Sequence, residues 1–92
     1  MVFSWDPRKD ESNFRKHRIT FFEASSVFLD PLSYTYEDVE HSIGEMRYII
    51  IGAMENGKIT VVIHTEDNDK IRIISAREAT ARERRFYEEA HS

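Results

Sequence analysis

The sequence predicts an α+β fold, in which an antiparallel β-sheet packs with two N-terminal helices and one C-terminal helix. Two β-branched runs flank Asn56-Gly57, a dipeptide typical of tight hairpins. A third such run begins at Lys70, after a short polar segment. Helix-capping signals precede the first of these runs and follow the last. The 92 residues suffice for one small domain, so we expect residues 1–92 to form a single unit.

Two helices are expected near the N-terminus. Asp6-Pro7 favours a helix start, and the polar stretch that follows has Phe14 as almost its only apolar anchor. Thr20 and Glu23 form a T-x-x-E capping box, and the apolar residues after it recur at helical spacing. Asp30-Pro31 should end this second helix. We therefore expect a solvated first helix and a second helix that belongs to the core.

The hairpin turn sets which side chains share a face of the sheet. A two-residue loop at Asn56-Gly57 pairs Ile49 with His64 and Arg47 with Glu66. Because side chains alternate along a strand, Arg47, His64 and Glu66 would then share one face. A slip of one residue would reverse this assignment. Residues 2–5 and 33–39 are compatible with additional short strands.

The next turn and the last helix complete the expected fold. A tight turn at Asp67-Asn68 pairs Ile63 with Arg72 and places Arg72 on the face opposite His64. Ser75 and Glu78 fit an S-x-x-E capping box, so the last helix should run from about residue 76 to about residue 90.

Composition limits the possible functions. The net charge of −4 argues against general nucleic-acid binding, and the lack of cysteine excludes disulfides and thiolate metal sites. A reducing cytoplasm is the expected location, and no apolar run is long enough to span a bilayer. Residues 21–57 carry seven acidic side chains against Arg47 alone, whereas both ends of the chain are basic. If the ends meet in the fold, they form one basic patch on an acidic protein.

The residues alone offer three candidate sites, each with a simpler structural explanation. The arginines of the C-terminal stretch suit phosphate binding, or they form a solvated face with local ion pairs: Arg72, Arg77, Arg82, Arg84 and Arg85. His17 suits acid–base chemistry, or it is an exposed residue at a helix end. The predicted Arg47–His64–Glu66 trio suits the same chemistry, or it is a salt bridge at the sheet rim. The histidines, His91 included, are too scattered to indicate a metal site.

An ordered set of short motifs resembles the BrnT family of toxins. The set comprises F-x-W-D at 3–6, Lys9, Asn13, Lys16-His17, F-x-E-A at 21–24, V-F-x-D-P at 27–31, Glu45, Arg47, R-I-I-S-A-R at 72–77, Glu83-Arg84 and Tyr87. It covers nearly the whole chain with similar spacing. The resemblance implies a RelE-like fold and the toxin of a type II toxin–antitoxin module.

That resemblance also implies an activity and partners. The toxin would be an endoribonuclease that inhibits translation by RNA cleavage, without a metal or other cofactor. Its partner would be a BrnA-like antitoxin in a 2:2 heterotetramer, which binds operator DNA through the antitoxin and involves no membrane. The alternative is a catalytically weak or inactive module that binds the antitoxin and acts as a transcriptional co-repressor.

The resemblance suggests which residues act. The candidate catalytic residues are Lys9, His17, Arg72, Arg77 and Arg84. The candidate substrate-binding residues are Trp5, Arg47, His64 and Tyr87. Arg72 and Arg77 would hold the scissile phosphate, and Lys9 or His17 would move a proton or neutralise charge. Trp5 and Tyr87 would stack on a base or simply pack.

Two positions depart from the family pattern. Arg18 replaces a glycine that often follows the first helix, so the turn there is expected to differ. Asp67 lies where family members often carry a basic residue. If that base contributes to cleavage, this chain is a weak or inactive nuclease.

Overall fold

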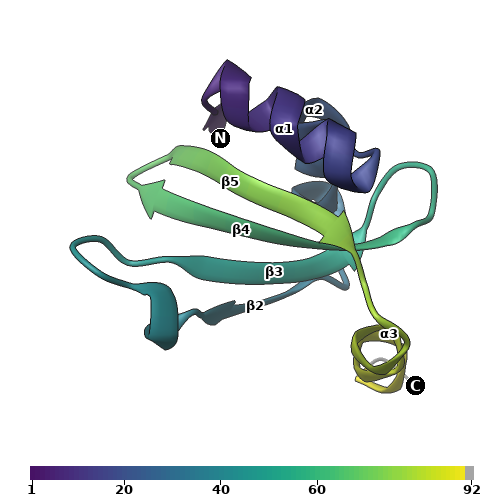
Figure 1. Ribbon diagram of the computed structural model, residues 1–92. Coiled ribbons are helices and arrows are strands. Elements are labelled where there is room, and N and C mark those ends of the chain that lie inside the picture. Colours follow the sequence, from purple (N-terminus) through teal and green to yellow (C-terminus); the bar gives the residue numbers. More distant parts are fainter. Residues whose placement is uncertain (91–92) are drawn as a thin grey trace.

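The computed structural model describes residues 1–90, and its α+β architecture confirms the predicted class (Figure 1). The elements in chain order are β1 (Val2–Ser4), α1 (Pro7–His17), α2 (Phe21–Ala24), the 3-10 helix η1 (Ser25–Leu29), β2 (Tyr34–Glu37), the 3-10 helix η2 (Val39–His41), β3 (Tyr48–Ala53), β4 (Ile59–Asp67), β5 (Lys70–Glu78) and α3 (Ala81–Glu89). The five strands form one sheet in the order β1-β5-β4-β3-β2. The sheet is mixed rather than antiparallel, because β1 pairs in parallel with β5.

Local signals set both N-terminal helices as predicted. The Asp6 side chain caps α1 by accepting from the Arg8 N–H, and Thr20 and Glu23 form the reciprocal capping box of α2. Arg18 ends α1 in the left-handed conformation, with φ of 60°. The turn is therefore the kind that glycine favours, formed here by an arginine, and the expected difference at this position is not found.

The predicted register of the first hairpin is wrong by one residue. Its loop has three residues, Glu55–Gly57, because the Met54 N–H donates to the Lys58 carbonyl and Gly57 takes a φ of +87°. A left-handed glycine at the third position is typical of three-residue hairpin loops. Tyr48, not Ile49, therefore pairs with His64.

The second turn is also displaced by one residue, to Asn68-Asp69. Thr65 pairs with Arg72 and His64 with Ile73, so Arg72 and His64 project to opposite faces of the sheet as predicted. A bulge follows, because the next pair joins Ile63 to Ser75 and leaves one residue of β5 unpaired.

The last helix begins later than predicted. Residues 75–78 continue β5 and pair with β4, and α3 begins at Ala81. The capping box is formed by Thr80 and Glu83 rather than by Ser75 and Glu78. Within residues 1–90, no helix combines the length and apolar character needed to cross a bilayer.

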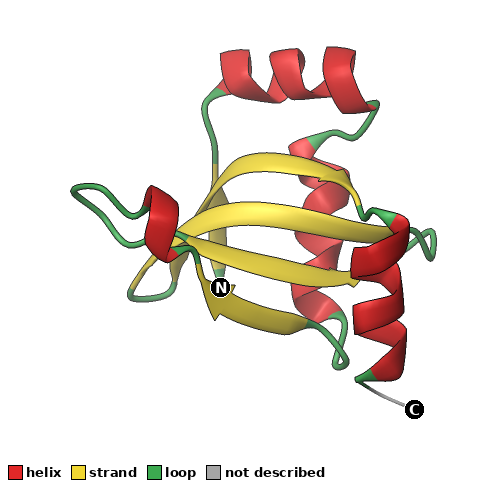
Figure 2. Ribbon diagram, turned by 60° about the horizontal axis from the view of Figure 1, so that its bottom comes forward, coloured by secondary structure: helices red, strands yellow, loops and turns green. Residues whose placement is uncertain are grey.

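The two faces of the sheet are covered to different extents. On one face, α1, α2 and η1 pack over a continuous core that includes Phe21, Ile50 and Val62. On the other face, α3 covers only one end, over Ile51 and Val61 (Figure 2). The rest of this second face is open.

Candidate functional site

The second face of the sheet carries both polar and apolar side chains where α3 does not cover it. We call this uncovered part the open sheet face, and its residues, assigned by strand register, are Tyr36, Ile49, Ile63, Thr65, Arg72, Ser75 and Arg77. Ile49 and Ile63 are half-buried, whereas Ile50 and Val62 on the covered face are fully buried. The mixture of arginines with partly exposed apolar side chains can bind a ligand that has both phosphate groups and planar bases.

Arg72 projects from β5 toward the loop before β3. Its guanidinium forms an ion pair with Glu45, which is 27 residues away in the sequence. About half of each side chain is exposed, at 47% for Arg72 and 50% for Glu45. Such an exposed pair contributes at most about 1 kcal/mol, so a phosphate can replace the carboxylate on this arginine.

Arg77 is held more firmly at the other end of β5. Its Nη1 and Nη2 donate to the two carboxylate oxygens of Glu83 at 2.7 and 2.9 Å. These hydrogen bonds hold the pKa of Glu83 at about 2 and raise the pKa of Arg77 above its usual value. Burial, followed by the Glu83 charge, raises the pKa of the neighbouring Tyr36 hydroxyl.

A small cleft adjoins the open sheet face at the free edge of β5. It has a volume of about 190 Å³ and is lined by Lys9, Ser12, Asn13, Lys16, His17, Ile74 and Ser75. Ser75 belongs to both the cleft and the open sheet face. We call this the β5-edge cleft, and it brings Lys9 and His17 of α1 beside the strand that carries Arg72 and Arg77.

Asn13 fixes α1 against this edge. The buried side-chain amide donates to the carbonyl of Ala76 at 2.8 Å and accepts from the Ala76 N–H at 3.1 Å. It also donates to the carbonyl of Ile19. β1 is short and pairs only with residues 70–72 of β5, so the backbone of Ala76 has no strand beside it on that edge. The Asn13 amide satisfies its N–H and C=O groups instead. Asn13 belongs to the family motif, but its place in the sequence does not indicate this role, because its partner Ala76 is 63 residues away.

Arg84 does not share a helical stripe with Arg77. A last helix that began at residue 76 would have placed both arginines on one helix, but Arg84 lies exposed on α3 whereas Arg77 lies on β5. Both belong to elements at the same end of the sheet, because Arg77 contacts Glu83 of α3.

The aromatic residues Trp5 and Tyr87 pack rather than face solvent. Trp5 meets Phe21 edge to face with ring centroids 6.2 Å apart, beside the covered core. Tyr87 of α3 is buried in a cluster with Ile51 and Val61, its hydroxyl donates to Asp30, and burial raises its pKa to about 12. Stacking on a base is therefore ruled out for Tyr87 in this conformation.

The predicted trio of Arg47, His64 and Glu66 does not assemble. His64 is fully buried on the covered face, between the rings of Phe28 and Tyr48, and its Nε2 lies 2.8 Å from Glu66. Substrate cannot reach it. Arg47 is half-buried and directly precedes Tyr48, the first residue of β3. Because side chains alternate along a strand and Tyr48 pairs with His64, Arg47 belongs to the face opposite to that of His64.

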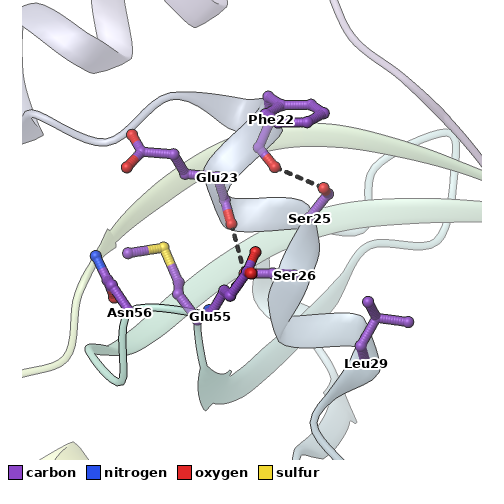
Figure 3. A pocket seen from close by; sticks show the side chains of 8 residues that line it. Phe22, Glu23, Ser25, Ser26, Leu29, Glu55 and Asn56 are labelled. Carbon is purple, nitrogen blue, oxygen red and sulfur yellow. Dashed lines mark hydrogen bonds between the residues drawn. The ribbon is translucent and has the colours of Figure 1, made fainter.

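A second hollow of about 430 Å³ lies between α2–η1 and the first hairpin (Figure 3). Phe22 and Leu29 flank it and are about three-quarters exposed. The Ser25 and Ser26 hydroxyls donate to the carbonyls of their own helical turn, so they are not aimed at a ligand. This α2 hollow has no catalytic grouping. In the described residues no three His, Cys, Asp or Glu side chains gather to hold a metal, and His91 lies outside them.

Comparison with known proteins identifies the family. The family model described as "Ribonuclease toxin, BrnT, of type II toxin-antitoxin system" matches residues 5–83. The crystal structure of the Brucella abortus ribonuclease toxin BrnT superposes with a TM-score of 0.67 at 20% identity, covering 87% of this chain and 99% of that one. At this identity the superposition shows a shared fold. A comparison with curated proteins gives no match. By its family match, the chain belongs to the BrnT family of ribonuclease toxins of type II toxin–antitoxin systems.

Proposed function

We propose that this chain is an endoribonuclease that binds RNA across the open sheet face and cleaves it beside the β5-edge cleft. The main support for this proposal is the placement of the β5 side chains. Arg72, Ser75 and Arg77 project to one face, and Ser75 also lines the cleft that holds Lys9 and His17. Family membership and this grouping of phosphate-binding and proton-transferring side chains support the proposal together.

The proposed reaction needs no metal. The ribose 2′-oxygen attacks the adjacent phosphorus and the bond from phosphorus to the 5′-oxygen breaks, which leaves a cyclic phosphate and a free 5′-hydroxyl. His17 either accepts the proton that the 2′-hydroxyl loses or donates the proton that the 5′-oxygen gains. Lys9 neutralises the charge that develops on the scissile phosphate, and Arg72 and Arg77, toward opposite ends of β5, donate bidentately to phosphates along the RNA strand. Arg84 and Arg47 contact the RNA backbone farther from the scissile bond.

The partners follow from the family. We propose that a BrnA-like antitoxin neutralises the toxin, in a complex of two toxins and two antitoxins that represses its own operon through the antitoxin. RNA cleavage by the free toxin then inhibits translation in the cytoplasm. These proposals rest on family membership.

RNA cleavage by the purified chain, with a chelator present throughout, tests the activity. We expect Arg72→Gln and His17→Ala each to reduce the cleavage rate by about 10²-fold or more. Arg85→Gln is the matched control, because Arg85 is an exposed arginine on α3 that lies outside the open sheet face. Folded Arg72→Gln and His17→Ala proteins with wild-type rates would refute the assigned roles. Cleavage that the chelator abolishes would refute the metal-free reaction.

A second function is favoured by the carboxylates on this surface. Glu45 and Glu83 already neutralise both arginines, and Asp67 ends β4 on the same side of the sheet as Thr65. This arrangement suits an inactive toxin that only binds the antitoxin and assists repression. Absence of cleavage by the wild type, with an antitoxin complex that still binds operator DNA, would support this function. Recovery of cleavage in Asp67→Lys would locate the cause.

A further inference from the structure

The free edge of β2 carries unused backbone hydrogen-bonding groups. β2 is the last strand of the sheet, with β3 on one side only. Just beyond the strand, the Asp38 N–H donates to the Arg47 carbonyl, so the backbone of Asp38 points toward β3. In an antiparallel pair, the backbone N–H and C=O groups of successive residues point alternately toward and away from the neighbouring strand. The backbone groups of Tyr36 and Tyr34 therefore also point toward β3. The N–H and C=O groups of Thr35 and Glu37 therefore point outward.

An aromatic groove runs beside this edge on the α3 side. It has a volume of about 450 Å³ and is lined by Tyr34, Tyr36, Ile51, Arg82, Glu83 and Phe86. Tyr34 and Phe86 meet edge to face with ring centroids 5.4 Å apart. Each of the three aromatic side chains is between 39% and 46% exposed, so the groove offers apolar surface that the chain itself does not bury.

Exposed apolar side chains concentrate along the same part of the chain. Among the described residues, twelve large apolar side chains are exposed, and six of them, from Leu32 to Met46, lie on β2 or in the segments that flank it. Scattered exposed apolar residues are normal, but a concentration beside an unpaired strand is typical of a protein–protein interface.

The negative charge around β2 favours a basic binding partner. Residues 21–57 contain seven acidic residues and one basic residue, and Glu37 lies on β2 itself. This field repels RNA, and in a second copy of the chain it would place one acidic edge against another. A basic polypeptide segment complements it.

We propose that the β2 edge takes up an extended segment of the antitoxin as a sixth strand. The proposal rests on the proposed function, which supplies an antitoxin. The added strand pairs with the outward groups of Thr35 and Glu37. Side chains of the added strand that lie on the face of Tyr34 and Tyr36 are apolar. Those that alternate with them, on the face of Glu37, are basic. The segment therefore reads as apolar and basic residues in alternation.

Binding to the antitoxin encoded by the neighbouring reading frame tests this proposal. Thr35→Pro removes an outward N–H without touching the β2–β3 bonds, and proline is tolerated on edge strands. We expect Thr35→Pro to weaken antitoxin binding at least tenfold, and the matched Thr35→Val control, which keeps the N–H, to bind within twofold of wild type. Glu37→Lys should also weaken binding. Wild-type affinity in folded Thr35→Pro and Glu37→Lys proteins would overturn the proposal.

Hydrogen exchange of the wild-type complex gives a test that needs no variant. The amides of Thr35 and Glu37 should exchange rapidly in the free toxin and become protected in the complex. Protection confined to the α2 hollow, with these amides unchanged, would instead place the antitoxin there. Binding is measured without RNA, so failed cleavage tests the proposed function alone. If the toxin is active, Thr35→Pro should remain toxic and escape neutralisation.

Discussion

The Arg77–Glu83 ion pair predicts how the stability of the protein depends on pH. Glu83 has a pKa of about 2 in the fold against an ordinary value of 4.5, chiefly because Arg77 donates two hydrogen bonds to it. Since one pKa unit corresponds to about 1.36 kcal/mol, the upper limit of the stabilisation is about 3 kcal/mol. The Arg77 side chain is 42% exposed, so solvent screening reduces the expected value to about 1–2 kcal/mol.

The sign follows from the lowered pKa. The contribution is complete above the unfolded pKa of about 4.5 and is lost as the pH falls toward 2, where the folded carboxylate also becomes protonated. Glu83→Gln removes the charge but keeps a side chain that can still close the capping box with Thr80. We therefore expect this variant to be about 1–2 kcal/mol less stable at neutral pH and to lose part of the acid dependence.

Chemical denaturation at a series of pH values between 7 and 2 measures this difference. Glu88→Gln is the control, because Glu88 is an exposed residue of α3 and the substitution changes the net charge equally. The difference in unfolding free energy between wild type and Glu83→Gln should shrink as the pH falls from 4.5 to 2. A difference that stays constant over this range, or one that Glu88→Gln reproduces, would refute the reasoning.

Three further substitutions test the fold by urea denaturation. Arg18→Gly should stabilise the protein by about 1 kcal/mol, because Arg18 occupies a left-handed conformation, and no gain would contradict that geometry. Asn13→Ala should cost about 2–4 kcal/mol, because it leaves the buried backbone groups of Ala76 and Ile19 without their partner. Gly52→Ala should cost about 1–3 kcal/mol, since its Cβ would lie 3.1 Å from the Ser33 Cβ and 3.2 Å from the Val27 carbonyl, and a neutral effect would show that these neighbours move freely.

Local interactions are the part of this fold that the sequence predicts well. The capping residues of the first two helices act within a few positions of each other, so their motifs are visible without any tertiary information. The start of the last helix was less predictable because two S/T-x-x-E motifs follow each other, at Ser75 and at Thr80. Pairing of residues 75–78 with β4 decides between them, and that pairing is a tertiary effect.

The sheet register depended on the length of one loop. Asn56-Gly57 fits both a two-residue and a three-residue hairpin, and the choice moves His64 from pairing with Ile49 to pairing with Tyr48. That single residue separates Arg47 from His64 and removes the predicted trio. Arg72 still lies on the face of the sheet opposite to that of His64. The displaced second turn changed its pairing partner from Ile63 to Thr65, and these two residues share a face.

The candidate site was predicted only in part for a related reason. The family resemblance singled out Arg72 and Arg77, but the carboxylates that pair with them come from a distant loop and from the next helix. The sequence left open whether Trp5 and Tyr87 stack on a base or simply pack, because the clusters they join are built from distant elements. Tyr36 was missed, because nothing in an ambiguous polar stretch indicates that its strand lies beside Arg77.

The acidic net charge does not argue against RNA as a substrate, because the charges are segregated in the fold. Acidic side chains concentrate in residues 21–57, which supply β2, β3 and their connections, whereas α1 and β5 come from the basic ends of the chain. Contacts between α1 and β5 bring those two ends together, as the Asn13 bridge to Ala76 shows. Screening in physiological salt limits surface electrostatics to about 8 Å, so an RNA phosphate responds to the local charge rather than to the total of −4. The same segregation leaves the β2 edge acidic, and a basic antitoxin segment there would bind beside the surface that we assign to RNA, with Tyr36 at the boundary between the two.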